Sequence, residues 1–316
     1  SVRCVPRQLH HIGGLRHVQD PAVSTTLVIN TSRTRTDRTR REGREAMELN
    51  WQGETLHCTD EGTADDAVLF LHGLGGNANN WLHQRRAFAQ HHRVITVDLP
   101  GHGRSTGTGI PFAQYADAAG AVLDHLRIDA VSVVGLAMGA RVGIALAARS
   151  PRRVRRLTVV NGCLELPPRE HERRVALYDL LLRPGGVREW AQALLEGMGV
   201  SGHAGIARGF LTSADRIDPA HVNAVFHQVD ALDQVEEFRA LVVPVQLIVG
   251  ERDHLVPTSS TDQLIALAGD ATISRFPGTG HLPYLEDPAA FNRALEDFLH
   301  GQAASADGVS RDTALR

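Results

Sequence analysis

The stretch VSVVGLAMG, residues 131–139, indicates the fold of this chain more strongly than any other segment. Its first four residues form a short apolar run typical of a buried strand, and a helix is expected directly afterwards, over Met138–Arg149. Gly135 and Gly139 carry no side chains, so Ala137, midway between them, can adopt a strained turn. The side chain of Ala137 would project above the strand, at a helix N-terminus whose partial positive charge favours anions. The stretch therefore predicts a sharp strand–turn–helix junction.

Short apolar segments alternate with helical segments on both sides of this junction. Further strands are expected over 67–71, 94–98, 157–160, 245–249 and 272–276, and further helices over 81–90, 114–126, 260–267 and 289–299. A hairpin is expected over residues 48–59, around the turn Gln52-Gly53. Apolar strands that alternate with helices are typical of a parallel sheet covered on both faces. The pattern predicts an α/β protein with a mostly parallel, doubly wound sheet.

One interval breaks this alternation. Between Gly162 and about Arg239 the sequence predicts no strand, and helices are expected over 175–182, 187–198, 204–210 and 220–229. Such an insertion would lie over the carboxyl ends of the strands, where open α/β sheets bind ligands. We therefore expect a disordered, Arg-rich extension over 1–46 and a core in two segments, 47–161 and 241–300. A helical cap is expected over 162–240 and a flexible tail over 301–316.

Composition excludes several classes of function. The 316 residues are 42% hydrophobic and 22% charged, as in ordinary globular proteins, and the net charge of −3 provides no basic field for nucleic acid. The three cysteines, Cys4, Cys58 and Cys163, do not fall at metal-ligand spacing, so we expect reduced thiols, a cytoplasmic location and no metal. No apolar run approaches the ~18 residues of a membrane span. Phosphate-binding motifs are absent, so we expect a small-molecule substrate and no cofactor, while the sequence makes no prediction of oligomeric state.

Four further motifs follow predicted strands. They are HGLGG at 72–76, DLPGHGRS at 98–105, GERDHLVP at 250–257 and GTGHLP at 278–283. Together with residues 135–139, and in this order along the chain, they resemble the α/β-hydrolase superfamily, in its capped, esterase- and lactonase-like branch. The resemblance covers residues 48–300 and implies the α/β-hydrolase fold with a helical cap.

The resemblance also implies roles for individual residues. Asp253 would be the catalytic acid and His281 the catalytic base, and the backbone amides of Leu74 and Met138 would form the oxyanion hole. Position 137 would hold the nucleophile, which is a serine in esterases of this superfamily, but here it is Ala137. Substrate-binding residues are expected in the loop after the first core strand and among the aromatic side chains of the core and cap, namely His72, Gly73, Trp81, Tyr178 and Trp190.

Ala137 leaves three hypotheses open, because a methyl group cannot attack a carbonyl. In the first, the chain is an inactivated variant of a hydrolase that acts on a small or medium apolar ester, thioester or lactone. In the second, the alanine is natural, and the dyad His281–Asp253 serves as the general base of a lyase, cyclase, isomerase or cofactor-free oxygenase. In the third, the protein binds a ligand on a hydrolase scaffold without catalysis.

Overall fold

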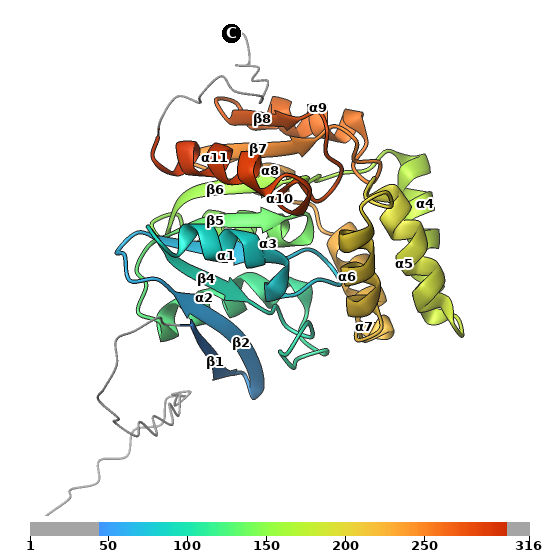
Figure 1. The fold of residues 1–316 in the computed structure, drawn as a ribbon, viewed down its shortest axis with the longest axis horizontal. Helices are drawn as coiled ribbons and strands as arrows, with labels where there is room; N and C mark the ends of the chain where they lie inside the picture. Colours follow the sequence, from blue (N-terminus) through green and yellow to red (C-terminus); the bar gives the residue numbers. More distant parts are fainter. Residues whose placement is uncertain (1–43, 302–316) are drawn as a thin grey trace, which may run out of the picture. The chain divides into compact units, whose positions relative to one another are not determined.

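The computed structural model describes residues 44–301, which form one mixed sheet flanked by helices (Figure 1). In these residues the sheet has eight strands in the order β1-β2-β4-β3-β5-β6-β7-β8. The strands are β1 (Arg44–Trp51), β2 (Glu54–Glu61), β3 (Ala67–Leu71), β4 (Arg93–Val97), β5 (Val131–Leu136), β6 (Val154–Val160), β7 (Val245–Gly250) and β8 (Thr272–Phe276). All pairs from β4 to β8 are parallel, and β2 is antiparallel to both of its neighbours. The predicted α/β-hydrolase fold class is confirmed.

Helices cover both faces of the sheet, which explains why its central strands β3 and β5 are buried along their whole length. In β3, Leu69 and Leu71 pack into one hydrophobic cluster, while Val68 and Phe70 pack into another on the opposite face. The first face is covered by α2 (Tyr115–His125), α3 (Met138–Arg149), α8 (Val235–Arg239) and α9 (Thr258–Leu267). The second is covered by α1 (Leu82–Phe88), α10 (Pro283–Glu286) and α11 (Pro288–Leu299) (Figure 1). Short 3₁₀ turns η1 (Ala78–Trp81) and η2 (Phe112–Gln114) precede α1 and α2.

The N-terminal hairpin differs from expectation in its first residue. The turn residues Gln52 and Gly53 have φ of 53° and 85°, as a two-residue type I′ turn requires. Strand β1 begins at Arg44, three residues before the expected start of the core, because it pairs with β2 along its whole length, from Arg44 opposite Glu61 to the turn. The rest of the predicted extension and the tail after residue 301 lie outside the described residues.

The interval between β6 and β7 forms the helical cap that the sequence predicts. Its helices are α4 (Pro168–Asp179), η3 (Leu180–Leu182), α5 (Gly186–Gly197), α6 (Ala204–Ala214), α7 (Pro219–Asp230) and the core-facing α8. Helix α4 begins seven residues earlier than expected, at Pro168, because proline fits the first position of a helix, where no N–H is needed. Among the described residues, no helix has the length and apolarity that would carry it across a bilayer.

Candidate active site

The junction between β5 and α3 holds Ala137 in a strained conformation. Its φ is 46° and its ψ is −106°, outside the regions that L-residues favour. The Ala137 N–H donates to the Val160 carbonyl at 3.0 Å, which ties the turn to the neighbouring strand. A Cβ on Gly139 would lie 2.4 Å from the Leu71 carbonyl oxygen, and one on Gly135 would lie 2.5 Å from backbone atoms of α3. The two glycines are therefore required by close backbone contact, as the sequence predicts.

His281 and Asp253 form a hydrogen-bonded pair at the ends of the loops that follow β8 and β7. His281 Nδ1 lies 2.6 Å from Asp253 Oδ2, and His281 is 7% exposed. The other carboxylate oxygen accepts from the backbone N–H groups of Leu255 at 2.8 Å and Val256 at 3.3 Å. Asp253 Oδ2 accepts the proton on Nδ1, and when the ring is neutral this arrangement leaves the lone pair on Nε2. The pair can therefore take a proton at Nε2.

Two polar side chains that the sequence analysis did not select hold these loops in place. The Asn161 side chain donates to the Gly280 carbonyl at 3.0 Å and accepts from the Gly250 N–H at 2.8 Å, so it joins the two loops. The Glu286 carboxylate accepts from the N–H groups of Gly280 at 2.9 Å and Leu282 at 3.1 Å, on either side of the histidine. Their partners are backbone groups, which leave no mark in a sequence motif.

Leu74 and Met138 line the same cavity as Ala137 and His281. Met138 is the first residue of α3, so its N–H lies at the positive end of the helix dipole. Within residues 44–301, no backbone or side-chain acceptor takes up the N–H of Leu74 or of Met138. Both amides are thus available to a ligand oxygen.

The cavity has a volume of about 970 Å³ and lies between the carboxyl ends of the strands and the cap. Leu164, Phe210, Phe226 and Leu255 are among the apolar side chains that line it. Gly73 and Tyr178, two of the predicted substrate-binding residues, also line it. Its size is at the upper end of the range for small-molecule sites, and its lining also includes charged side chains such as Glu165 and Arg174, so it suits a ligand with both apolar and polar parts.

The two tryptophans predicted to bind substrate do not line the cavity. Trp81 is fully buried, with its ring centroid 5.1 Å from that of Phe70 and 4.4 Å from that of Tyr284. Trp190 is also fully buried, and it packs behind the cavity wall against Tyr178 and Phe210, with ring centroids 5.9 Å away in both cases. Hydrophobic packing placed these rings in the core, because an indole removes more apolar area from water there.

His72 is likewise buried and does not line the cavity. Its Nδ1 donates to the Gly73 carbonyl at 2.8 Å, and its Nε2 accepts from the Leu99 N–H at 3.0 Å. Burial lowers the pKa of His72, which agrees with a neutral ring whose two nitrogens are both satisfied. Both ring nitrogens of His72 are thus engaged by backbone groups of the neighbouring loops.

Arg141 connects the cap to α3, one helical turn after Ala137. The side chain is buried, and burial lowers its pKa. Its guanidinium donates to carbonyls on both sides of the cap and to one side-chain amide. The acceptors are Cys163 at 3.1 Å, Leu164 at 2.9 Å, Val229 at 3.4 Å, Leu232, and Gln234 Oε1 at 2.6 Å. Both ends of the cap are thus fixed to the helix that begins at the strained turn.

Comparison with known proteins agrees with this architecture. A family model described as the alpha/beta hydrolase fold matches residues 66–288. The RutD protein of Escherichia coli (strain K12 / DH10B), provisionally named a carbamate hydrolase, is 30% identical over 252 residues, 75% of this chain and 94% of RutD. The structure of an enol-lactonase from Burkholderia xenovorans LB400 is similar, with a TM-score of 0.72 and 23% identity over 80% of this chain and 100% of the other. An esterase from Thermogutta terrifontis gives 0.71 and 23%, over 83% and 98% of the two chains.

Proposed function

The chain belongs to the α/β-hydrolase family, and from that premise we propose that it binds a small or medium-sized ester, thioester, lactone or carbamate with the substrate carbonyl over Ala137. One observation carries the proposal: a single cavity brings together the strained turn at Ala137, the paired His281, and the free amides of Leu74 and Met138. These are the groups that acyl transfer requires. The similarity to RutD is the reason to include carbamates.

The site has the layout of a serine hydrolase without the serine hydroxyl. With a serine at position 137, His281 Nε2 would take the hydroxyl proton as the oxygen attacks the substrate carbonyl, and Asp253 would stabilise the imidazolium. The amides of Leu74 and Met138 would bind the oxyanion of the tetrahedral intermediate. Ala137 offers no lone pair, so the chain as it stands has no route through a covalent acyl-enzyme.

A water molecule is the nucleophile that this arrangement can still activate. His281 Nε2 would take a proton from water as the water oxygen attacks the substrate carbonyl, and it would return that proton to the leaving oxygen, sulfur or nitrogen. The two amides and the histidine base remain, but a water nucleophile is not attached to the protein as a serine hydroxyl would be. We therefore expect slow turnover, well above the uncatalysed rate and far below that of a serine enzyme.

Proton transfer without hydrolysis is the second candidate, and the intact dyad favours it. His281 and Asp253 keep a 2.6 Å hydrogen bond although residue 137 has no hydroxyl to deprotonate. Such a base could remove an acidic proton next to a carbonyl bound to the two amides, giving an enolate as in lyases and isomerases.

A paired assay of the protein and its Ala137→Ser variant tests the proposal. The substrates are nitrophenyl esters of increasing chain length, an acyl thioester, a lactone and an aryl carbamate. We expect the serine to raise kcat/KM on at least one of them by about three orders of magnitude or more. Ala137→Gly, which also lacks a nucleophile, should stay at the parent level, and Ala137→Ser combined with His281→Gln should lose the gain.

If Ala137→Ser folds as the parent does but stays at background on every substrate, the hydrolase proposal is wrong. Deuterium exchange from solvent into carbonyl compounds then tests the second candidate. Exchange that disappears in His281→Gln would support it, whereas ligand binding with neither exchange nor hydrolysis would indicate a non-catalytic binding protein.

A further inference from the structure

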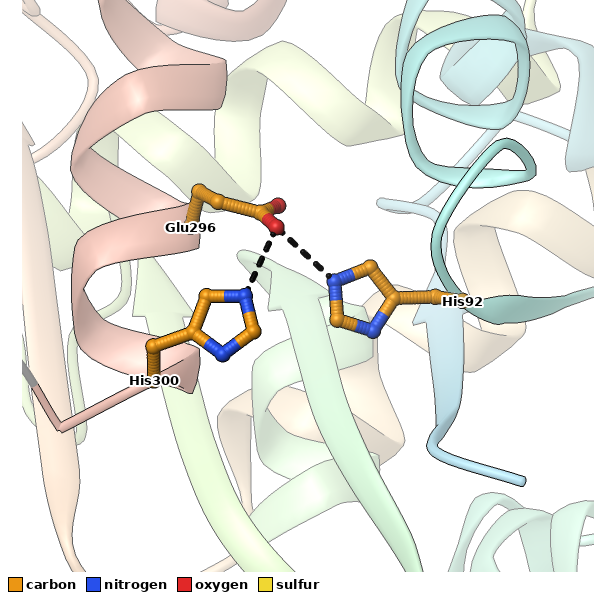
Figure 2. Close-up of side chains that lie close together, drawn as sticks. All are labelled: His92, Glu296 and His300. Atoms are coloured by element: carbon orange, nitrogen blue, oxygen red, sulfur yellow. Dashed lines mark hydrogen bonds and ion pairs between the residues drawn. The ribbon is translucent and has the colours of Figure 1, made fainter. Parts of the chain in front are cut away.

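Two histidines and a glutamate meet near the amino end of β4 (Figure 2). His92 lies immediately before β4, whereas Glu296 and His300 are one turn apart at the end of α11. Glu296 Oε1 is 3.1 Å from His92 Nε2 and 3.0 Å from His300 Nε2. Figure 2 shows both imidazole rings with a nitrogen pointing at this one carboxylate.

His92 lies between two carboxylates, those of Glu296 and Asp66. The residue is 1% exposed, and its Nδ1 is a buried nitrogen without a hydrogen-bond partner, although Asp66 Oδ2 lies 3.4 Å away. A metal ion bound at Nε2 would leave the single N–H of the ring at Nδ1. That N–H would face Asp66, so Glu296 would contact the ion and Asp66 the ring N–H.

We propose that His92, Glu296 and His300 bind a divalent transition-metal ion of the Zn²⁺ class, with water as the fourth ligand. Imidazole nitrogens with a carboxylate are ligands that Zn²⁺ favours, whereas Mg²⁺ and Ca²⁺ prefer oxygen alone. Tetrahedral Zn²⁺ sites separate their N and O ligand atoms by about 3.3 Å. The three ligand atoms lie within 4.8 Å of one another, so small side-chain rotations suffice.

Asp66 would complete the site as the carboxylate that orients a ligand histidine. Metal-bound histidines commonly donate their second N–H to a carboxylate, which fixes the ring and strengthens binding. Asp66 is itself held by Arg155, whose Nη1 lies 2.6 Å from its other oxygen. The carboxylate is therefore positioned to receive the His92 N–H when Nε2 binds the metal.

The ion would stabilise the fold rather than take part in the chemistry of the cavity. His92 precedes the amino end of β4, and Ala137 follows the carboxyl end of β5, which lies in the same parallel set. The ligands are separated by 204 residues in the chain, so a bound ion would join the loop after α1 to the last helix. An ion that binds only the folded state raises its stability.

Zinc titration of the metal-free full-length protein tests this site. We expect a calorimetric binding event in the parent protein, and a rise in Tm of about 5–10 °C when free Zn²⁺ exceeds Kd a hundredfold. His300→Ala and Glu296→Gln should lose one equivalent of binding or weaken it at least tenfold. His300 is half exposed, so its removal should not prevent folding.

His125→Ala is the matched control, because it removes an exposed histidine from α2 without touching the cluster. It should keep the parent stoichiometry and Tm shift. The sequence also contains His10, His11 and His17, which could bind zinc independently of the cluster. The equivalent of zinc that the cluster binds is therefore the one that His300→Ala loses and His125→Ala keeps. The proposal is wrong if zinc leaves the Tm of the parent unchanged, if His300→Ala and Glu296→Gln bind as the parent does, or if Mg²⁺ gives the same shift as Zn²⁺.

Discussion

Replacement of Arg141 by lysine should weaken the attachment of the cap to α3. The guanidinium donates to five acceptors, which are four backbone carbonyls and Gln234 Oε1. A lysine ammonium has only three N–H donors and a different geometry. Arg141→Lys keeps the charge and much of the length, so it isolates the loss of hydrogen bonds.

The size of the effect follows from the number of acceptors left without a donor. At least two of the five lose their partner, and an unsatisfied buried acceptor costs about 1–3 kcal/mol. Two such acceptors would together cost about 2–6 kcal/mol, and water reaches some of the partly buried carbonyls, which places the sum near the lower end. We therefore expect Arg141→Lys to reduce the free energy of unfolding by about 2–3 kcal/mol, or Tm by about 5–10 °C.

Urea unfolding followed by circular dichroism measures this loss, with Arg149→Lys as control. Arg149 lies on the same helix, but its side chain is 42% exposed, donates to the Ala113 carbonyl and forms an ion pair with Asp117 at 3.6 Å. Its replacement should change the free energy of unfolding by less than about 0.5 kcal/mol. Equal stability of the two variants would refute the idea that the Arg141 hydrogen bonds hold the cap.

Two further predictions concern the backbone at the turn and the buried histidines. Gly139→Ala would place a Cβ 2.4 Å from the Leu71 carbonyl oxygen and should lower the free energy of unfolding by several kcal/mol. Gly120→Ala in α2 meets no atom within 4 Å and should raise the free energy of unfolding by about 0.5–1 kcal/mol. Thermal unfolding of both variants tests these opposite signs. Burial and the nearby His72 lower the pKa of His102, so the unfolded chain takes up a proton below pH ~6.5 that the folded state resists. The free energy of unfolding should fall as pH drops below that value, by up to ~1.4 kcal/mol per pH unit from this histidine. Urea unfolding at pH 7.5 and 5.5 should show a smaller loss of stability in His102→Gln than in the parent protein. Equal losses in the two proteins would contradict the assignment.

The sequence alone determined the sheet, the order of the motifs and the turn at Ala137. Strands that are apolar at nearly every position need neighbours on both faces, and this requirement is visible in the residue types of β3 and β5. Gly135 and Gly139 lie two residues before and after Ala137, and their lack of side chains allows the backbone to turn sharply there. The strained turn could therefore be predicted from residues that are neighbours in the chain. These features depend on local backbone conformation, which neighbouring residues largely decide.

The first residue of α4 and the start of β1 were harder to predict, because pairing and packing with other segments set them. Strand β1 extends to Arg44 since β2 offers a partner as far as Glu61. Helix boundaries move by a few residues when a proline such as Pro168 can serve as the first residue.

Only the tertiary structure decided which side chains surround the cavity and which groups meet across long stretches of chain. The sequence gives Trp81 and Tyr178 the same apolar character, yet one packs in the core and the other lines the cavity. The cluster of His92, Glu296 and His300 leaves no spacing motif, because its members come from segments 204 residues apart. Their proximity results from the packing of α1 against α11, and such packing depends on the shapes of distant surfaces rather than on any local pattern.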